Sequence, residues 1–143
     1  MGSRLTSALL QLPVQLHGIK LGRPVDVLLD TGGWRAFGFV VLCGDESRRF
    51  LPYAAAQTGE DEIAVVSALM LLEDVAFYAN RSASLRGLLG GEVTSAGRSV
   101  GSLQDVLLDE HGSVEMLVTE REGRERRLDP AGAVVAPRRA SAA

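Results

Sequence analysis

The sequence has little of what stabilises or equips several classes of protein. Cys43 is its only cysteine, which excludes an intrachain disulfide and a cysteine pair for zinc, and its apolar surroundings favour a buried thiol. No apolar run reaches the roughly 18 residues of a membrane-spanning helix, and residues 1–14 lack the pattern of a secretory signal. We therefore expect a cytoplasmic protein without a membrane span.

The sequence also contains fewer basic than acidic residues. Lysine and arginine together number 15 against 18 acidic residues, which gives a net charge of -3. Proteins that bind nucleic acid through its phosphates normally show a basic face, so this balance argues against nucleic acid as the main partner. His17 and His111 lie in polar segments without neighbouring ligand residues at metal spacing. We expect no metal site and no cofactor.

What the chain does contain is a tandem repeat. The segment Asp-Val-Leu-Leu-Asp at residues 26–30 recurs at residues 105–109, an offset of 79 residues. The same offset pairs further valines and glycines without a gap: Val14 with Val93, Gly18 with Gly97, Gly22 with Gly101, Gly33 with Gly112, and Gly44 with Gly123. A repeat of this length indicates two small units, and each would have a marginal core on its own.

Each copy shows short β-type segments separated by glycine-containing turns. They cover residues 25–29, 34–42 and 48–51 in copy one and residues 101–108, 114–119 and 126–128 in copy two. Such a unit is too small for a sandwich and must curl to bury one face, so we predict an all-β protein of two small antiparallel β-barrels in tandem. The expected divisions are a first repeat at 1–67, a connector with a short helix at 68–84, a second repeat at 85–137 and a disordered tail at 138–143.

The repeated pattern resembles the PRC-barrel domain. Its features here are a glycine-led strand ending in Asp-Val-Leu-Leu-Asp, a glycine-bearing turn, an apolar strand and an Arg-Arg ending before proline. The match runs from Leu12 to about Val66 in copy one and from Leu88 to Pro137 in copy two. This domain is named for the H subunit of the photosynthetic reaction centre and also occurs in the ribosome maturation factor RimM.

The resemblance implies a noncatalytic protein-interaction or assembly module, because the family has no common catalytic residue and no common cofactor. It does not identify a partner, since partners differ across the family. An unknown protein or a second copy of the chain in a homodimer would fit. The alternative is a ribosome or RNA-processing factor by analogy with RimM, against which the negative net charge argues.

An enzyme is the competing interpretation of the first aspartate segment. Leu28 to Gly32 resembles the Asp-Thr-Gly loop of retroviral-type aspartic proteases, in which two aspartates share one proton. The counterpart of Asp30 is Asp109, which Glu110, His111 and Gly112 follow, so copy two cannot supply a matched half. An aspartate before a glycine-containing hairpin is more simply a turn residue that accepts backbone hydrogen bonds. We expect no catalytic residue.

Comparing the aligned strands after the turn predicts a shared core. Phe37 and Phe39 align with Met116 and Val118, and alternation along a strand places each pair on one face. The opposite face of copy two carries a mostly polar set: Ser113, Glu115, Leu117, Thr119 and Arg121. The same positions in copy one are Trp34, Ala36, Gly38, Val40 and Leu42.

A strand that is apolar on both faces is either covered on both or awaits a partner. We therefore predict that Trp34, Ala36, Val40 and Leu42 form an interface with copy two, with a second chain or with an unknown partner. Two further explanations stay open. The register of the strand shifts, or the connector helix lies across this face.

Overall fold

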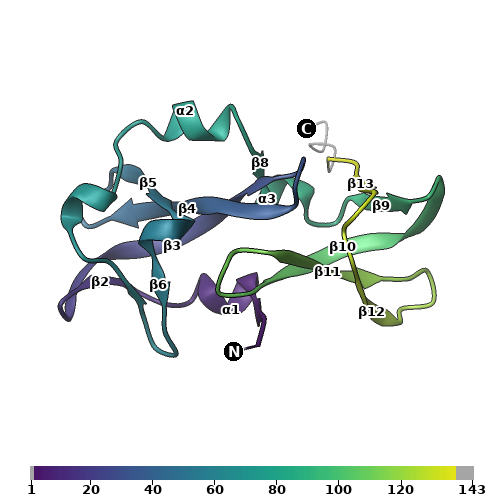
Figure 1. Ribbon diagram of the computed structural model, residues 1–143, viewed down its shortest axis with the longest axis horizontal. Coiled ribbons are helices and arrows are strands. Elements are labelled where there is room, and N and C mark those ends of the chain that lie inside the picture. Colours follow the sequence, from purple (N-terminus) through teal and green to yellow (C-terminus); the bar gives the residue numbers. More distant parts are fainter. Residues whose placement is uncertain (1, 138–143) are drawn as a thin grey trace.

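The computed structural model describes residues 2–137, which form two β-sheets side by side with short helices at their margins (Figure 1). Sheet one has the order β5-β4-β3-β2-β7-β6 and sheet two the order β12-β11-β10-β9-β13. Sheet one consists of β2 (Val14–Leu16), β3 (Ile19–Asp30), β4 (Arg35–Cys43), β5 (Arg48–Pro52), β6 (Gln57–Thr58) and β7 (Ile63–Ala64). Sheet two consists of β9 (Glu92–Ser95), β10 (Arg98–Leu108), β11 (Val114–Thr119), β12 (Glu125–Leu128) and β13 (Ala133–Val135).

Between the sheets' main strands lie short elements that join or cover them. They are β1 (Arg4–Leu5), α1 (Thr6–Leu9), the 3-10 helices η1 (Tyr53–Ala55) and η2 (Ala68–Met70), α2 (Val75–Ala79), β8 (Ala83–Ser84) and α3 (Leu85–Leu88). The all-β class and the short connecting helix are confirmed, with α2 inside the predicted range. Closure of each sheet into a barrel stays a prediction, and the tail at 138–143 lies outside the described residues. In the described part of the chain, no helix is long and apolar enough to cross a membrane.

The two halves fold alike because they share local sequence signals. The β2–β3 turn holds His17 and Gly18 at φ 49° and 81°, and the β9–β10 turn holds Ala96 and Gly97 at φ 52° and 77°. Two successive positive φ values define the type I′ turn whose twist suits a tight hairpin, and glycine adopts them without strain. The repeated glycines at 18 and 97 therefore mark equivalent hairpins.

The first segment of each repeat lies on the sheet of the other repeat. β1 pairs with β10, placing Arg4 opposite Leu108, while β8 pairs with β3, placing Ala83 opposite Leu29. The two pairings are equivalent, because each residue of the first lies 79 positions from a residue of the second. At the same offset β1 corresponds to β8 and α1 corresponds to α3, so we call residues 2–82 half one and residues 83–137 half two. The halves thus exchange their opening strand and helix.

A hydrophobic core shared by both halves follows from this exchange. One cluster of buried side chains contains Leu9 and Phe39 of half one together with Leu85, Met116 and Val118 of half two. Each of these side chains is 0% or 1% exposed. Two small sheets that could bury little surface alone therefore share one interior.

The expectation that Phe37 and Phe39 share the core face is wrong. β3 pairs Leu28 with Gly38 and Leu29 with Ala36, so Phe37 is an extra residue in β4. Such a β-bulge reverses the alternation of side chains on one side of it. Phe39 stays in the main core, whereas Phe37 packs in a second cluster on the opposite face.

A turn that is one residue longer in half one, together with the bulge, changes which residues of the halves are equivalent. Leu29 pairs with Ala36 and its counterpart Leu108 pairs with Val114, an offset of 78. Beyond the bulge Asp26 pairs with Val40 and Asp105 pairs with Leu117, an offset of 77 rather than 79. Phe39 is therefore the counterpart of Met116. At the next turn Glu46, with φ 68°, takes the place of Gly123, with φ 82°. The sequence match of Gly44 with Gly123 is wrong for this reason.

Candidate interaction surface

The first part of the predicted interface, Trp34 and Ala36, lies at the junction between the halves. The backbone N–H of Ala36 donates to the carbonyl of Gly112 at 2.7 Å, and the N–H of Val114 donates to the carbonyl of Trp34 at 3.2 Å. The Trp34 side chain is 7% exposed and belongs to the main core. The sequence predicted that these two residues contact copy two, a second chain or an unknown partner. The structure shows that they contact copy two.

The second part, Val40 and Leu42, lies under the connector. These residues belong to a second cluster on the outer face of sheet one, which we call the outer cluster: Val25, Leu28, Phe37, Val40, Leu42, Phe50, Leu72, Val75 and Tyr78. Figure 1 shows α2 above β4 and β5, where Tyr78 stacks on Phe50 with ring centroids 4.1 Å apart. Both further explanations therefore apply: the strand register shifts, and the connector lies across this face. Half two covers Trp34 and Ala36, and the connector covers Val40 and Leu42, so the predicted interface is covered from within the chain.

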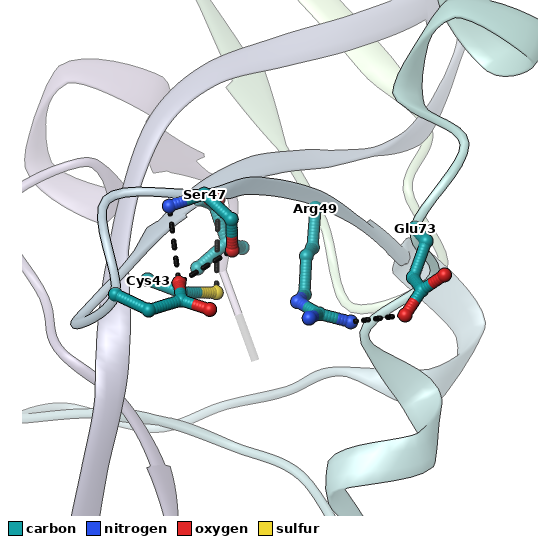
Figure 2. A network of polar contacts seen from close by, with 6 residues as sticks. Cys43, Ser47, Arg49 and Glu73 are labelled. Atoms are coloured by element: carbon teal, nitrogen blue, oxygen red, sulfur yellow. Dashed lines mark hydrogen bonds and ion pairs between the residues drawn. The ribbon is translucent and has the colours of Figure 1, made fainter.

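The connector holds this position through its backbone as well as its side chains. The N–H of Phe50 donates to the carbonyl of Leu72, and the N–H of Leu72 donates to the carbonyl of Phe50, both at 2.8 Å. Beside this bridge, Arg49 Nη1 lies 3.4 Å from Glu73 Oε1 (Figure 2). Residues 71–78, which we call the connector segment, thus extend sheet one by one residue and then form a helix over its outer face.

Half two has no such cover on the equivalent strand. The register pairs Leu117 with Arg127 as it pairs Val40 with Phe50, so Arg126 and Arg127 are the counterparts of Arg49 and Phe50. Within residues 2–137, β12 ends the sheet, and no segment pairs with its outer side. We call this outer side the open edge, and the neighbouring surface formed by Glu115, Leu117, Thr119 and Arg127 the open face.

On half two, the position equivalent to Phe50 of the outer cluster holds Arg127, and charged residues form ion pairs there. Arg126 Nη1 lies 3.4 Å from Glu120 Oε1, and Arg127 Nη1 lies 3.5 Å from Glu115 Oε1. The Arg127 side chain is 67% exposed, whereas Phe50 is 1% exposed. Sequence reasoning missed the open edge because the uninterrupted offset aligned the wrong residues. Aligning the Arg-Arg endings would not have found it, because that alignment pairs Phe50 with Leu128 instead of with Arg127.

The first aspartate of each repeated segment joins one half to the other. Asp26 accepts a hydrogen bond from the backbone N–H of Arg86 in α3, and Asp105 accepts one from the N–H of Ser7 in α1. The Ser84 hydroxyl also donates to Asp26. A carboxylate at the start of a helix satisfies N–H groups that have no partner within the helix. These aspartates therefore fasten the exchanged helices.

The second aspartate of each segment serves its own turn, as predicted. Asp30 Oδ1 accepts from the N–H of Gly32 at 2.9 Å, and Asp109 Oδ1 accepts from the N–H groups of His111 and Ser113 at 2.9 Å. Desolvation acts in the opposite direction, but the hydrogen bonds from Ser113 and His111 lower the pKa of Asp109 below its usual value. Among residues 2–137 no hydrogen bond joins Asp30 to Asp109.

Tyr53 adds a further link between the halves. Its hydroxyl donates to the backbone carbonyl of Asp109 at 2.8 Å, so a side chain of half one holds the turn of half two. Desolvation, followed by the negative charge of Asp109, raises the pKa of Tyr53. The phenol therefore stays a hydrogen-bond donor above the pH at which a free tyrosine ionises.

The remaining candidate ligands lie apart. Cys43 is half-buried, and desolvation raises the pKa of its thiol. His111 approaches the neighbouring Glu110 at 3.4 Å, with both side chains exposed. The part of the chain that the structure describes holds no group of three or more potential metal ligands.

No protein-family model matches the chain, and no curated protein is significantly similar to it. The PRC-barrel resemblance therefore stays a prediction.

Proposed function

We propose that this protein is a noncatalytic protein-interaction or assembly module of the PRC-barrel type. One observation carries the proposal. Half one binds a chain segment on the outer face of its sheet, and half two presents the equivalent strands without a segment on them. A strand with unpaired backbone groups next to an exposed face is a recurrent way to recognise an extended peptide.

The shared core supports this role by making the surface rigid. In half two, β10 and β11 carry core side chains that pack against half one. A partner that docks on the open face would therefore meet a preformed surface, which keeps the entropic cost of binding low.

Site-specific photocrosslinking in native lysate tests the proposal. A photoreactive residue at Thr119, on the open face, should yield a discrete partner adduct that mass spectrometry identifies. The same residue at Lys20, an exposed position in half one, is the matched control and should not yield that adduct.

Three results would count against the proposal. One is the absence of any adduct specific to Thr119. Another is copurified RNA, visible as excess absorbance at 260 nm, which would favour the RNA-processing alternative. The third is pepstatin-sensitive peptide cleavage that disappears in Asp30→Asn, which would favour the protease.

A further inference from the structure

We propose that the open edge of β12 binds an acidic, extended segment of a partner protein by strand addition, with Arg126 and Arg127 selecting its charge. This assignment rests on the proposed function and names the site and the class of ligand. Half one shows how such a segment can bind, because the connector segment occupies the equivalent edge of β5.

The backbone geometry of the two edges is the same. In an antiparallel ladder, alternate residues direct their N–H and C=O groups toward the neighbouring strand, and the residues between direct them away. Phe50 directs its groups away from β4, where Leu72 bonds to both. Arg127 occupies the same place in the β11–β12 register, so its N–H and C=O face outward. Within residues 2–137 no strand or bridge partner takes them.

Two neighbouring arginines of the open edge favour acidic residues, with Glu125 before them in β12 as an opposing charge. In half one Glu73 of the connector segment pairs with Arg49. Half two keeps an arginine at that position, Arg126, and replaces Phe50 with Arg127. The carboxylates that now pair with these arginines are Glu120, which is 28% exposed, and Glu115, whose Oε1 is buried without a hydrogen-bond partner among the described residues. The arginine side chains themselves are 47% and 67% exposed, so an acidic ligand can reach them from the solvent side while adding two backbone hydrogen bonds.

The same charges disfavour a second copy of the chain at this edge. Two β12 strands that pair antiparallel around Arg126, around Arg127 or between them always place an arginine opposite an arginine. Like charges directly opposite one another destabilise a strand pair. Charged edges also prevent indiscriminate strand pairing, so the edge selects its ligand by charge.

The open face fits the remainder of such a segment. In the outer cluster Tyr78 stacks on Phe50. Arg127 is the counterpart of Phe50 in the strand register, and an aromatic ring can stack on a guanidinium through a cation–π contact. Leu117 offers apolar surface beside it. A segment that carries a leucine, an acidic pair and then an aromatic residue therefore matches both the edge and the face.

The connector sequence itself is a suitable probe. A fluorescein-labelled peptide of residues 70–79, Met-Leu-Leu-Glu-Asp-Val-Ala-Phe-Tyr-Ala, is titrated into the full chain and followed by fluorescence anisotropy. We expect saturable binding that weakens as salt increases, because exposed charges are screened. Backbone amide shifts in NMR spectra should concentrate on β12 and β11. A peptide with lysine in place of both acidic residues should not bind.

Matched variants separate the backbone contribution from the charge contribution. Arg127→Pro removes the outward N–H at an edge position that tolerates proline, whereas Arg127→Ala keeps that N–H. We expect binding to be lost in the first variant and retained, weakened severalfold, in the second. Arg126→Glu should weaken binding at least about tenfold, and a peptide with lysine at the position of Glu73 should restore it. Circular dichroism and thermal melting establish that each variant is folded.

Several results would overturn the assignment. They are no binding up to about 1 mM peptide, affinities unchanged by Arg127→Pro and Arg126→Glu, or amide shifts confined to β5, where the peptide would displace the connector segment. A partner crosslinked through Thr119 whose yield does not change in Arg126→Glu would also overturn it and leave the proposed function standing. Loss of every specific adduct would remove the proposed function itself.

Discussion

Half one and half two share a strand plan and differ in what lies on their outer faces. Where half one buries Phe50 beneath Tyr78, half two exposes Arg127 in an ion pair with Glu115. The connector segment accounts for the difference, because it packs on one sheet only. An apolar outer face in one copy of a repeat thus indicated an internal cover, and the polar face of the other copy is the accessible one.

The halves are alike where they hold each other. Asp26 and Asp105 cap the exchanged helices, and β1 and β8 make equivalent pairings. The aspartates that join the halves are the same residue type in both copies, whereas the residues of the outer faces differ. Substitutions at equivalent positions of the two halves therefore test both the similarity of the junction and the difference between the outer faces.

The largest effect is expected from the shared core. Phe39→Ala and Met116→Ala remove equivalent, fully buried side chains and should lower the free energy of unfolding by about 3 to 5 and about 2 to 5 kcal/mol, respectively. Chemical denaturation should show one transition for both variants, because one cluster spans the two halves. Separate transitions, with each variant shifting only its own, would show that the halves unfold independently.

Exchanging the residues of the two outer faces should have unequal effects. Phe50→Arg places a charge beneath Tyr78 and should cost about 2 to 4 kcal/mol. The reciprocal Arg127→Phe, which removes one ion pair of an exposed side chain, should change stability by no more than about 1 kcal/mol. Thermal denaturation of both variants measures the difference. Equal costs would mean that the two faces are equally covered in solution.

Removing the aspartates that cap the exchanged helices should have a smaller effect. Asp26→Ala and Asp105→Ala each leave one helix N–H without its acceptor and should cost about 1 to 2 kcal/mol. Hydrogen exchange should increase at the first turn of α3 in Asp26→Ala and of α1 in Asp105→Ala. Increased exchange confined to the half that carries the substitution would contradict the exchange of segments.

The smallest effect concerns pH and the turn aspartates. The pKa of Asp109 is lowered in the folded state, so its carboxylate stabilises the fold above its ordinary pKa of about 3.9 and loses this effect as pH falls through the lowered value. Asp109→Asn should lower stability at neutral pH by about 0.5 kcal/mol, discounted for its exposure. The difference from the parent chain should disappear in acid. A difference between Asp109→Asn and the parent chain that persists in acid would contradict the assignment.

Much of the local structure was predictable because short-range rules govern it. The repeat paired Gly18 with Gly97, which lie in equivalent hairpins, and Asp30 and Asp109 were expected to accept turn hydrogen bonds. The candidate site was predictable only in part. Trp34, Ala36, Val40 and Leu42 were expected to be covered by something, but strict alternation failed at Phe37, where one extra residue reversed the faces.

The sequence by itself determined the duplication, the β class and the turns, since each depends on residues close together in the chain. Only the tertiary structure decided that the halves exchange their first segments, that the connector covers sheet one and that β12 stays open. Those features depend on contacts between distant residues, which many pairings with the same hydrophobic pattern would satisfy. A pattern shows that a face must be buried, and packing decides what buries it.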